Sequence, residues 1–258
     1  MSGAGARVPR AALVTGAGRR IGRALALDLA RSGWAVAVHH HGSGEAAAAV
    51  VETILAAGGR AIAVAGDLAD ETATATLVGR AAAALGPVGV LVNNASVFER
   101  DEALTATRES WDAHLAVNLR APFVLTQSLA RALPRDAEGV VVNLLDERVW
   151  SLTPHFVSYT VSKSALWTLT RTLALALAPR IRVNGIGPGP TLPSPRQSPG
   201  QFAAQCASVP LGRGTSPEEI CTALRFILDA SSMTGQMIAL DGGQHLQWSP
   251  VGRNEIEE

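Results

Sequence analysis

Three side chains in the middle of the chain stand at a spacing that suits proton transfer. Asp146 follows an apolar, β-branched run that begins at Val140 and predicts a buried strand of a parallel sheet. Tyr159 and Lys163 lie four positions apart in a helical pattern over about residues 155–178, so both side chains share one helix face. A phenol has an unperturbed pKa of about 10, and a neighbouring ammonium lowers that pKa by favouring phenolate. We therefore expect Tyr159 and Lys163 to move a proton, with Asp146 adding a hydrogen bond or relaying the proton.

Tyr159 and Lys163 could be an ordinary surface pair, but a glycine-rich turn near the amino terminus favours a catalytic role for them. Residues 11–14 predict a short buried strand that runs directly into the segment 15–22, and a helical pattern follows. Strand, turn and helix in this order let the backbone approach a pyrophosphate at a helix amino terminus. We predict a dinucleotide site rather than a merely structural turn, formed by Gly16, Arg19, Ile21 and Gly22.

The end of the next predicted strand indicates which dinucleotide binds. Residues 34–38 lead into three consecutive histidines, with no acidic residue nearby to hold ribose hydroxyls. Imidazoles, a hydroxyl and an arginine can receive a 2′-phosphate, so we expect NADPH as the cofactor. The candidate groups are Arg19, His39, His41 and Ser43. The histidines could instead bind a metal, but consecutive side chains at a strand end point in alternating directions, and we expect no metal.

Further candidate residues follow the ends of other predicted strands. Asp67, followed by Leu68, is placed either to accept from the adenine amino group or to cap the next helix. Asn93 is expected mainly to satisfy stray backbone groups. Phe98 lies at the carboxyl edge of the sheet, where it either joins the core or stacks on a flat substrate.

Two later features complete the predicted site. Asn118, a polar amide in an apolar helical stretch, either pairs with a backbone carbonyl or holds a water molecule in a relay toward Lys163. The strand predicted over residues 181–186 runs into a turn that we expect to lie along the nicotinamide and its carboxamide. The residues of that turn are Pro188, Gly189 and Thr191, the last as a phosphate or amide partner.

The composition excludes several classes of partner. Lys plus Arg and Asp plus Glu both number 22, so a formal net charge of zero favours neither nucleic acid nor an acidic membrane surface. Cys206 and Cys221 show no metal-like spacing, which favours a reduced, cytoplasmic setting. No apolar run reaches membrane-spanning length. We expect a small-molecule substrate.

Alternating strand and helix patterns without an internal linker predict one domain. We expect a single doubly wound α/β domain of the Rossmann type, with a parallel sheet flanked by helices, over residues 10–248. Residues 1–9 and 249–258 are expected to be tails, the first of them disordered. The segment 190–213 has little periodicity and is expected to be a long substrate loop, either a lid or disordered. Trp248 either covers a neighbouring subunit's site or packs on its own domain.

In this order, the motifs resemble those of the short-chain dehydrogenase/reductase family. The resemblance covers about residues 10–245 and rests on Thr15, Gly16, Gly22, Asp67, Asn93, Asn94, Ala95, Asn118, Tyr159, Lys163, Pro188 and Gly189. It implies a Rossmann-type sheet, hydride transfer with a nicotinamide cofactor, and usually a homotetramer. By the same resemblance, Tyr159 is the catalytic acid or base, Lys163 binds ribose and lowers the tyrosine pKa, and Asn118 supports the proton relay. Cofactor contacts are expected from Leu68, Asn94 and Ala95.

Two departures from the family pattern resemble the pteridine reductases and the dihydromonapterin/dihydrofolate reductases. Arg20 stands where the family usually has a third glycine, and Asp146 stands where it has a catalytic serine. The resemblance implies that Asp146 and Tyr159 deliver a proton to a ring nitrogen while NADPH gives hydride to the adjacent carbon. It also implies that Arg20 approaches the cofactor phosphates and the pterin. Phe98 is then expected to sandwich the pterin against the nicotinamide, and Ser96 to contact cofactor or substrate.

The favoured function is therefore an NADPH-dependent reductase of a dihydropteridine of the dihydrobiopterin, dihydromonapterin or dihydrofolate type. The alternative is a generic carbonyl reductase or alcohol dehydrogenase, against which Asp146 argues because a carboxylate opposes developing alkoxide charge. A third class, a non-catalytic nucleotide sensor or scaffold on the same fold, is disfavoured by the intact Asn118, Tyr159 and Lys163 set.

Overall fold

A parallel sheet forms the centre of the molecule. The computed structural model describes residues 8–247, and there seven strands pair in the order β3-β2-β1-β4-β5-β6-β7, each parallel to its neighbours. The strands are β1 (Ala11–Val14), β2 (Ala35–His40), β3 (Ala61–Ala65), β4 (Val88–Asn93), β5 (Gly139–Leu144), β6 (Ile181–Pro188) and β7 (Met237–Leu240). The predicted doubly wound α/β fold is confirmed. Trp248 and the two expected tail segments, apart from Val8 and Pro9, lie outside the described residues.

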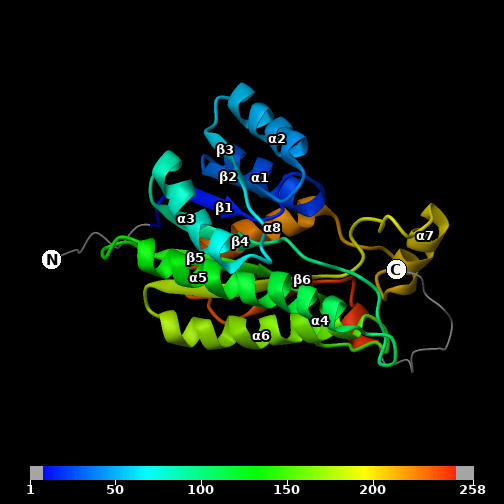
Figure 1. The fold of residues 1–258 in the computed structure, drawn as a ribbon. Coiled ribbons are helices and arrows are strands. Elements are labelled where there is room, and N and C mark those ends of the chain that lie inside the picture. Colours follow the sequence, from blue (N-terminus) through cyan, green and yellow to red (C-terminus); the bar gives the residue numbers. More distant parts are fainter. Residues whose placement is uncertain (1–7, 248–258) are drawn as a thin grey trace.

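Helices cover both faces of the sheet (Figure 1). One face carries α1 (Arg20–Arg31), α2 (Gly44–Ala56) and α8 (Pro217–Asp229), and the other carries α3 (Glu71–Leu85), α5 (Ala121–Ala132) and α6 (Val157–Leu177). The remaining helical elements are α4 (Arg108–Leu115), the π-helical turn η1 (Ala116–Arg120), α7 (Pro199–Ser208) and the 3-10 turns η2 (Glu147–Val149) and η3 (Gln244–Leu246). Within residues 8–247, no helix combines the length and apolar character that a membrane span requires.

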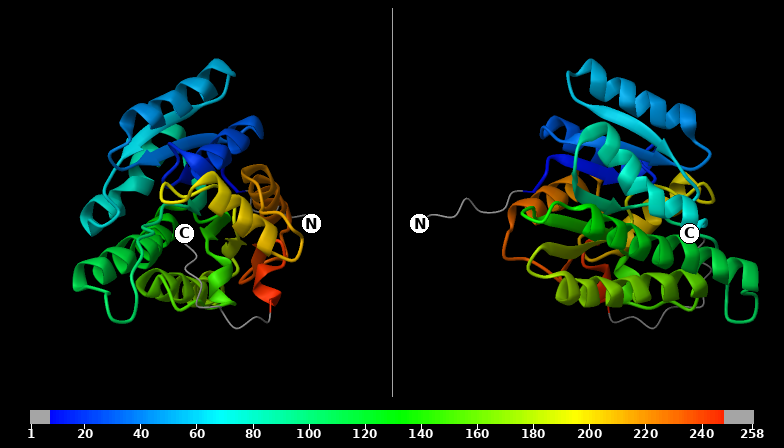
Figure 2. Two further views of the ribbon diagram at one scale, coloured as in Figure 1. Left: turned by 90° about the vertical axis from the view of Figure 1, so that its right-hand side faces the viewer. Right: turned by 60° about the vertical axis from the view of Figure 1, so that its left-hand side comes forward.

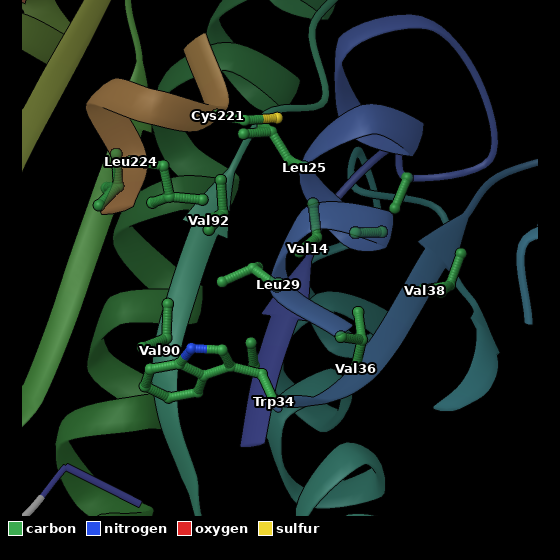
Figure 3. Close-up of a cluster of buried hydrophobic side chains, with 14 of the residues drawn as sticks. Val14, Leu25, Leu29, Trp34, Val36, Val38, Val90, Val92, Cys221 and Leu224 are labelled. Atoms are coloured by element: carbon green, nitrogen blue, oxygen red, sulfur yellow. The ribbon is translucent and has the colours of Figure 1, made fainter. Parts of the chain in front are cut away.

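Successive residues of the central strands alternate between two hydrophobic cores. Val14 of β1 belongs to the core under α1, whereas Leu13 belongs to the core under α3, α5 and α6. Figure 3 shows the first core, where Val14 and Val92 of neighbouring strands lie near Leu29 of α1 and Leu224 of α8. Because both faces of the sheet are covered, its strands are mostly apolar rather than alternating in polarity.

The direction of winding reverses at β1. The chain proceeds from β1 through β2 to β3 on one side, and then from β4 through β7 on the other. In open α/β sheets such a reversal leaves a crevice at the carboxyl ends of the strands, where ligands bind. In the left view of Figure 2, the yellow segment that includes α7 lies in front of this part of the fold. The fold therefore places the glycine turn after β1 beside the chain that follows β4.

The segment 190–213 is only partly the loop that its composition predicts. It contains α7, which is ten residues long. Ser198 and Gln201 form a capping box, in which each side chain accepts a hydrogen bond from the other residue's backbone N–H. None of the α7 residues is buried. A helix that buries no face needs no apolar periodicity, so the sequence pattern gave no sign of it.

The two-core arrangement predicts which leucines carry stability. Leu29 is 1% exposed between α1 and the sheet, so Leu29→Ala leaves a cavity and should lower the free energy of unfolding by about 3 kcal/mol. Leu175 on α6 is 84% exposed, and Leu175→Ala should change it by less than about 0.5 kcal/mol. Urea unfolding of both variants measures the difference. Equal effects of the two substitutions on the free energy of unfolding would contradict the burial of Leu29 between α1 and the sheet.

Candidate active site

A cavity of about 1030 Å³ lies at the carboxyl ends of the strands. Its size suits a dinucleotide together with a small substrate. Nearly every residue that the sequence singled out lines it: Gly16, Arg19, Arg20, Ile21, Gly22, His39, His41, Ser43, Asp67, Leu68, Asn94, Ala95, Ser96, Phe98, Asp146, Tyr159, Lys163, Pro188, Gly189 and Thr191. Thr15, Asn93 and Asn118 are exceptions, since all three are buried, Asn118 in η1.

Asp146 and Tyr159 meet in this cavity. Asp146 follows β5, and its Oδ1 accepts a hydrogen bond from the backbone N–H of Arg148 at 2.9 Å, which begins the η2 turn. The Tyr159 hydroxyl donates to Asp146 Oδ2 at 2.6 Å. The carboxylate is therefore held on one oxygen by its own turn and on the other by the phenol. The contact between Asp146 and Tyr159 expected from the spacing is present.

The electrostatics at Tyr159 differ from the expectation. Burial and the Asp146 carboxylate raise the pKa of Tyr159 well above its ordinary value of 10.0. Lys163 donates from Nζ to the Leu144 carbonyl at 2.7 Å, and its Nζ lies 5.7 Å from the centroid of the tyrosine ring. Burial lowers the pKa of Lys163 to about 8, while Asp146 acts in the opposite direction. The expected lowering of the tyrosine pKa by Lys163 is thus wrong in this state, and Tyr159 is a protonated donor.

The start of α6 is fixed by Asp101, from the chain between β4 and α4. Asp101 is 4% exposed, and its Oδ1 accepts from the Ser158 backbone N–H at 3.0 Å. Its backbone carbonyl accepts from Phe156, which has a left-handed φ of 59°. Ser110 of α4 donates to the second Asp101 oxygen at 2.8 Å. Tyr159 is therefore held in place by a residue far from it in sequence.

The glycine turn after β1 is shaped to admit a phosphate. A Cβ at Gly22 would overlap the Gly16 carbonyl, so no other residue fits there without a shift. Asn94 holds the turn, donating from Nδ2 to the carbonyls of Thr15 at 2.8 Å and Gly16 at 3.2 Å. Arg19, at the N-cap of α1, makes no side-chain cap. The first N–H groups of α1 thus lack a side-chain acceptor, and a pyrophosphate would fit them.

Among the three histidines at the end of β2, His39 and His41 lie in different environments. His39 is buried, and burial lowers its pKa to about 4, so the ring is neutral. Its Nδ1 accepts from the Gly16 N–H at 3.2 Å and its Nε2 lies 3.2 Å from the Gly66 carbonyl, so the ring tethers the turn and cannot receive a phosphate as a cation. His41 is exposed, with Nδ1 3.8 Å from Asp67 Oδ1. Over residues 8–247, no three His, Cys, Asp or Glu side chains converge as a metal requires.

Asp67 is not the helix cap that the sequence offered as one alternative. Asp70 caps α3, accepting from the backbone N–H groups of Thr72 and Ala73. Asp67 accepts from the Ala69 N–H at 2.9 Å and keeps its side chain 49% exposed in the cavity wall. Its predicted role toward adenine remains a prediction.

Two arginines connect the cavity rim to the segment 190–213. Arg20, with a positive φ of 52°, donates to the carbonyls of Pro193 at 2.8 Å and Leu192 at 3.1 Å. Arg196 donates to the Phe98 carbonyl at 2.5 Å and to Glu99 Oε2 at 2.6 Å. Arg20, the arginine predicted to approach the cofactor phosphates, thus binds the backbone of the segment 190–213.

Phe98 stands between the core and the cavity. One ring face stacks on Phe156, with centroids 4.6 Å apart and planes 3° from parallel. Its ring also meets the Tyr159 ring edge-on at a centroid distance of 4.6 Å. Phe98 thus packs on the buried Phe156 and also lines the cavity, and its stacking on a flat substrate stays a prediction.

The two asparagines that were expected to bond to the backbone behave differently. Asn118 lies in the η1 π-turn, donating to the Val97 carbonyl at 2.9 Å and to Ser162 Oγ at 3.0 Å and accepting from the Val97 N–H at 2.8 Å and from Ser96 Oγ at 3.1 Å. It therefore pairs with the backbone, as one alternative held. Asn93 instead donates to the Asn143 side chain at 2.8 Å, so the expectation for it was wrong.

Four residues near the site escaped the sequence reasoning. Glu147 and Arg148 follow Asp146 and are 3% and 5% exposed. Arg148 Nε lies 3.8 Å from Asp146 Oδ1. Ser162 bonds Asn118, and Gln244 lines the cavity from η3. Three charged residues in a row directly after an apolar strand were the available signal for the first two. Ser162 and Gln244 stand in no recognisable pattern.

A family model described as short chain dehydrogenase matches residues 10–201. The chain belongs to the short-chain dehydrogenase/reductase family. The family resemblance carried by the motifs is confirmed.

Two solved structures extend the comparison. The FolM alternative dihydrofolate reductase 1 of Brucella suis in complex with NADP is 48% identical, with a TM-score of 0.91, over 95% of this chain and 98% of that chain. Its Brucella canis counterpart, also complexed with NADP, is 47% identical, with a TM-score of 0.92, over 96% and 98% of the two chains. Both agree with the expected subgroup and with the expected cofactor.

A curated relative is named for a different class of substrate. The 3-oxoacyl-(acyl-carrier-protein) reductase of Synechocystis is 33% identical over 236 residues, which are 90% of this chain and 95% of that protein. Family membership therefore leaves the class of substrate open.

The glycine turn predicts a cofactor-binding defect. In Gly22→Ala, the new methyl group displaces the Gly16 carbonyl, and the affinity for NADPH should fall at least about tenfold. Gly79→Ala in α3 is the control, since its Cβ meets nothing within 4 Å. Titration of NADPH fluorescence measures both variants. Wild-type affinity in Gly22→Ala contradicts the phosphate site.

Glu147 predicts a pH dependence of stability. Burial, together with Asp146, raises the pKa of Glu147 from 4.5 to about 8. The folded protein therefore holds this proton more tightly than the unfolded chain, and stability falls as the pH rises from about 5 to about 8. Glu147→Gln removes this loss, so its stability relative to wild type should rise by roughly 2 kcal/mol or more over that interval. Thermal melts at several pH values test this, and a difference that does not vary with pH contradicts it.

Proposed function

We propose that this protein is an NADP-dependent reductase of dihydropteridines, of the dihydrobiopterin, dihydromonapterin or dihydrofolate type. The observation that carries the proposal is the Tyr159 hydroxyl bonded at 2.6 Å to the Asp146 carboxylate inside the cavity. A carboxylate backed by a protonated phenol suits delivery of a proton to a basic ring nitrogen. The two Brucella structures, described as alternative dihydrofolate reductases, support the same substrate class.

The residues divide the reaction between them. The glycine turn after β1 and the turn at Pro188 would hold NADPH, which would supply hydride to the carbon of a C=N bond. The adjacent ring nitrogen takes a proton from the Asp146–Tyr159 pair, so the double bond becomes CH–NH. Lys163 is bonded to the Leu144 carbonyl and places a positive charge near the phenol. This charge stabilises the negative charge that remains after proton transfer. Phe98 offers a ring in the cavity wall for the flat substrate.

The proton-donor pair gives the decisive experiment. NADPH oxidation is followed with dihydrobiopterin and dihydrofolate in wild type, Asp146→Ala and Tyr159→Phe. Each substitution should lower kcat at least about 100-fold and change KM only a few-fold, because the pair acts in proton delivery. Asp112→Ala, on an exposed α4 position, is the matched control and should keep wild-type turnover.

Fluorescence titration of NADPH separates loss of chemistry from loss of the fold, since both variants should bind the cofactor as wild type does. Unchanged turnover in Asp146→Ala removes the mechanism. No turnover of any dihydropteridine by a wild type that binds NADPH removes the substrate class.

Reduction of a carbonyl is the second candidate, favoured by the similarity to a 3-oxoacyl reductase. In that chemistry the Asp146 charge opposes the alkoxide that forms. Asp146→Ser should therefore raise activity on a panel of ketones at least about tenfold while lowering activity on dihydropteridines. If wild type already reduces ketones well and Asp146→Ser weakens that activity, the carbonyl reading replaces the pteridine one.

A further inference from the structure

Two residues that line the cavity each carry an oxygen atom that lacks a hydrogen-bond partner. Oε2 of Glu147 and Oε1 of Gln244 are shielded from solvent and receive no hydrogen bond from any described residue. Both residues line the same cavity as Asp146 and Tyr159. A buried acceptor without a partner destabilises the fold, so two of them at one site call for a donor that arrives with a ligand.

The two side chains approach the reaction centre from different elements. Glu147 opens η2 directly after Asp146, and Gln244 opens η3 after the last strand. The two turns pack against each other. Gln244 Oε1 also lies against Gly189, since a Cβ there would be 3.1 Å from it. Gln244 therefore lies against the turn that follows β6, and Glu147 lies next to the proton-donating pair, in the turn that packs on η3.

The surroundings of Glu147 leave its carboxyl group uncharged near neutrality. Asp146 and Asp241 repel a negative charge there, and Arg148 opposes them. Tyr159 on α6 faces it as a neutral phenol, and His245 on η3 is bonded to Asp241 at 2.6 Å. Burial adds to the repulsion and raises the pKa of Glu147 to about 8. An uncharged carboxyl group accepts a hydrogen bond through one oxygen and donates one through the other.

We infer that Glu147, with Gln244 beside it, forms a subsite that binds the amino group on the pyrimidine ring of the substrate. This inference rests on the proposed dihydropteridine function and names the part of the substrate that decides specificity. An aminopyrimidine edge presents an N–H donor beside a ring nitrogen acceptor, which complements a neutral carboxyl group.

The spacing suits a bicyclic substrate. Consecutive Cα atoms are about 3.8 Å apart, so Asp146 and Glu147 can address two groups on one flat molecule. Asp146 then serves the nitrogen that is protonated, and Glu147 holds the amino group on the other ring. A carbonyl substrate without N–H donors leaves both oxygens unpaired, so the subsite discriminates against it.

The test compares a dihydropterin with the dihydrolumazine that carries an oxo group in place of the amino group. Wild type should prefer the dihydropterin in kcat/KM. Glu147→Leu should lower that preference at least about tenfold, mainly through KM for the dihydropterin. Glu147→Gln keeps one acceptor oxygen and should restore most of the preference. Gln244→Leu should lower it in the same direction. A preference that is the same in wild type and Glu147→Leu overturns the inference.

A binding measurement keeps the test independent of turnover and of folding. Pterin and lumazine are titrated into the NADP⁺ complexes of wild type, Glu147→Gln and Glu147→Leu by calorimetry, after thermal melts establish that each variant is folded. Tighter binding of pterin than of lumazine, lost in Glu147→Leu and kept in Glu147→Gln, supports the subsite. Equal affinities in wild type overturn it. A change confined to NADPH affinity assigns the two oxygens to the cofactor and also overturns it.

The turnover and binding measurements distinguish failure of the amino-group subsite from failure of the dihydropteridine function. If wild type reduces dihydropterins through Asp146 but Glu147→Leu keeps its specificity, only the subsite fails. If no dihydropteridine is reduced or bound, both proposals fail.

Discussion

The hydrogen bond between Tyr159 and Asp146 depends on three separate parts of the fold. Asp146 is placed by β5 and by the η2 turn that its own carboxylate caps. Tyr159 is placed by the first turn of α6, which Asp101 holds from the chain after β4. Lys163 ties α6 back to the end of β5 through the Leu144 carbonyl. Because each group is fixed by a different segment, the bond forms only when the whole carboxyl edge of the sheet is assembled.

Burial gives this bond its chemical character. A phenol removed from water beside a carboxylate keeps its proton, since ionisation would place two negative charges side by side. A second carboxyl group, Glu147, adds to the same effect, and its own proton is retained for the same reason. Arg148 supplies positive charge near Asp146. Tyr159 and Glu147 thus retain their protons, and the site presents proton donors rather than a phenolate base. Proton donors suit reduction of a C=N bond better than oxidation of an alcohol.

Arginine side chains link the segment 190–213 to the glycine turn after β1 and to the chain that follows β4. Arg20 belongs to the turn that is shaped for a phosphate, yet its guanidinium holds carbonyls of the segment 190–213. Arg196 of that segment reaches across to Phe98 and Glu99. These contacts close the segment over the cavity from both sides. One side chain, Arg20, therefore joins the glycine turn to the backbone of the segment 190–213.

Local patterns in the sequence determined the family, most of the elements and many of the residues that line the cavity. Strands buried on both faces are continuous apolar runs, and the turn after β1 needs glycine for steric reasons, so both are visible in a single segment. The spacing of Tyr159 and Lys163 likewise follows from helix geometry alone. The helix α7 was missed, because a helix without a buried face has no periodicity.

Tertiary structure decided what these residues do. The direction of the Tyr159 pKa, the neutral state of His39 and the side-chain partner of Asn93 each depend on groups from distant segments. The same is true of the unpaired oxygens of Glu147 and Gln244. Proton affinity and hydrogen-bond satisfaction are set by the degree of burial and by the identity of neighbours, and neither is encoded in the spacing of residues along one element.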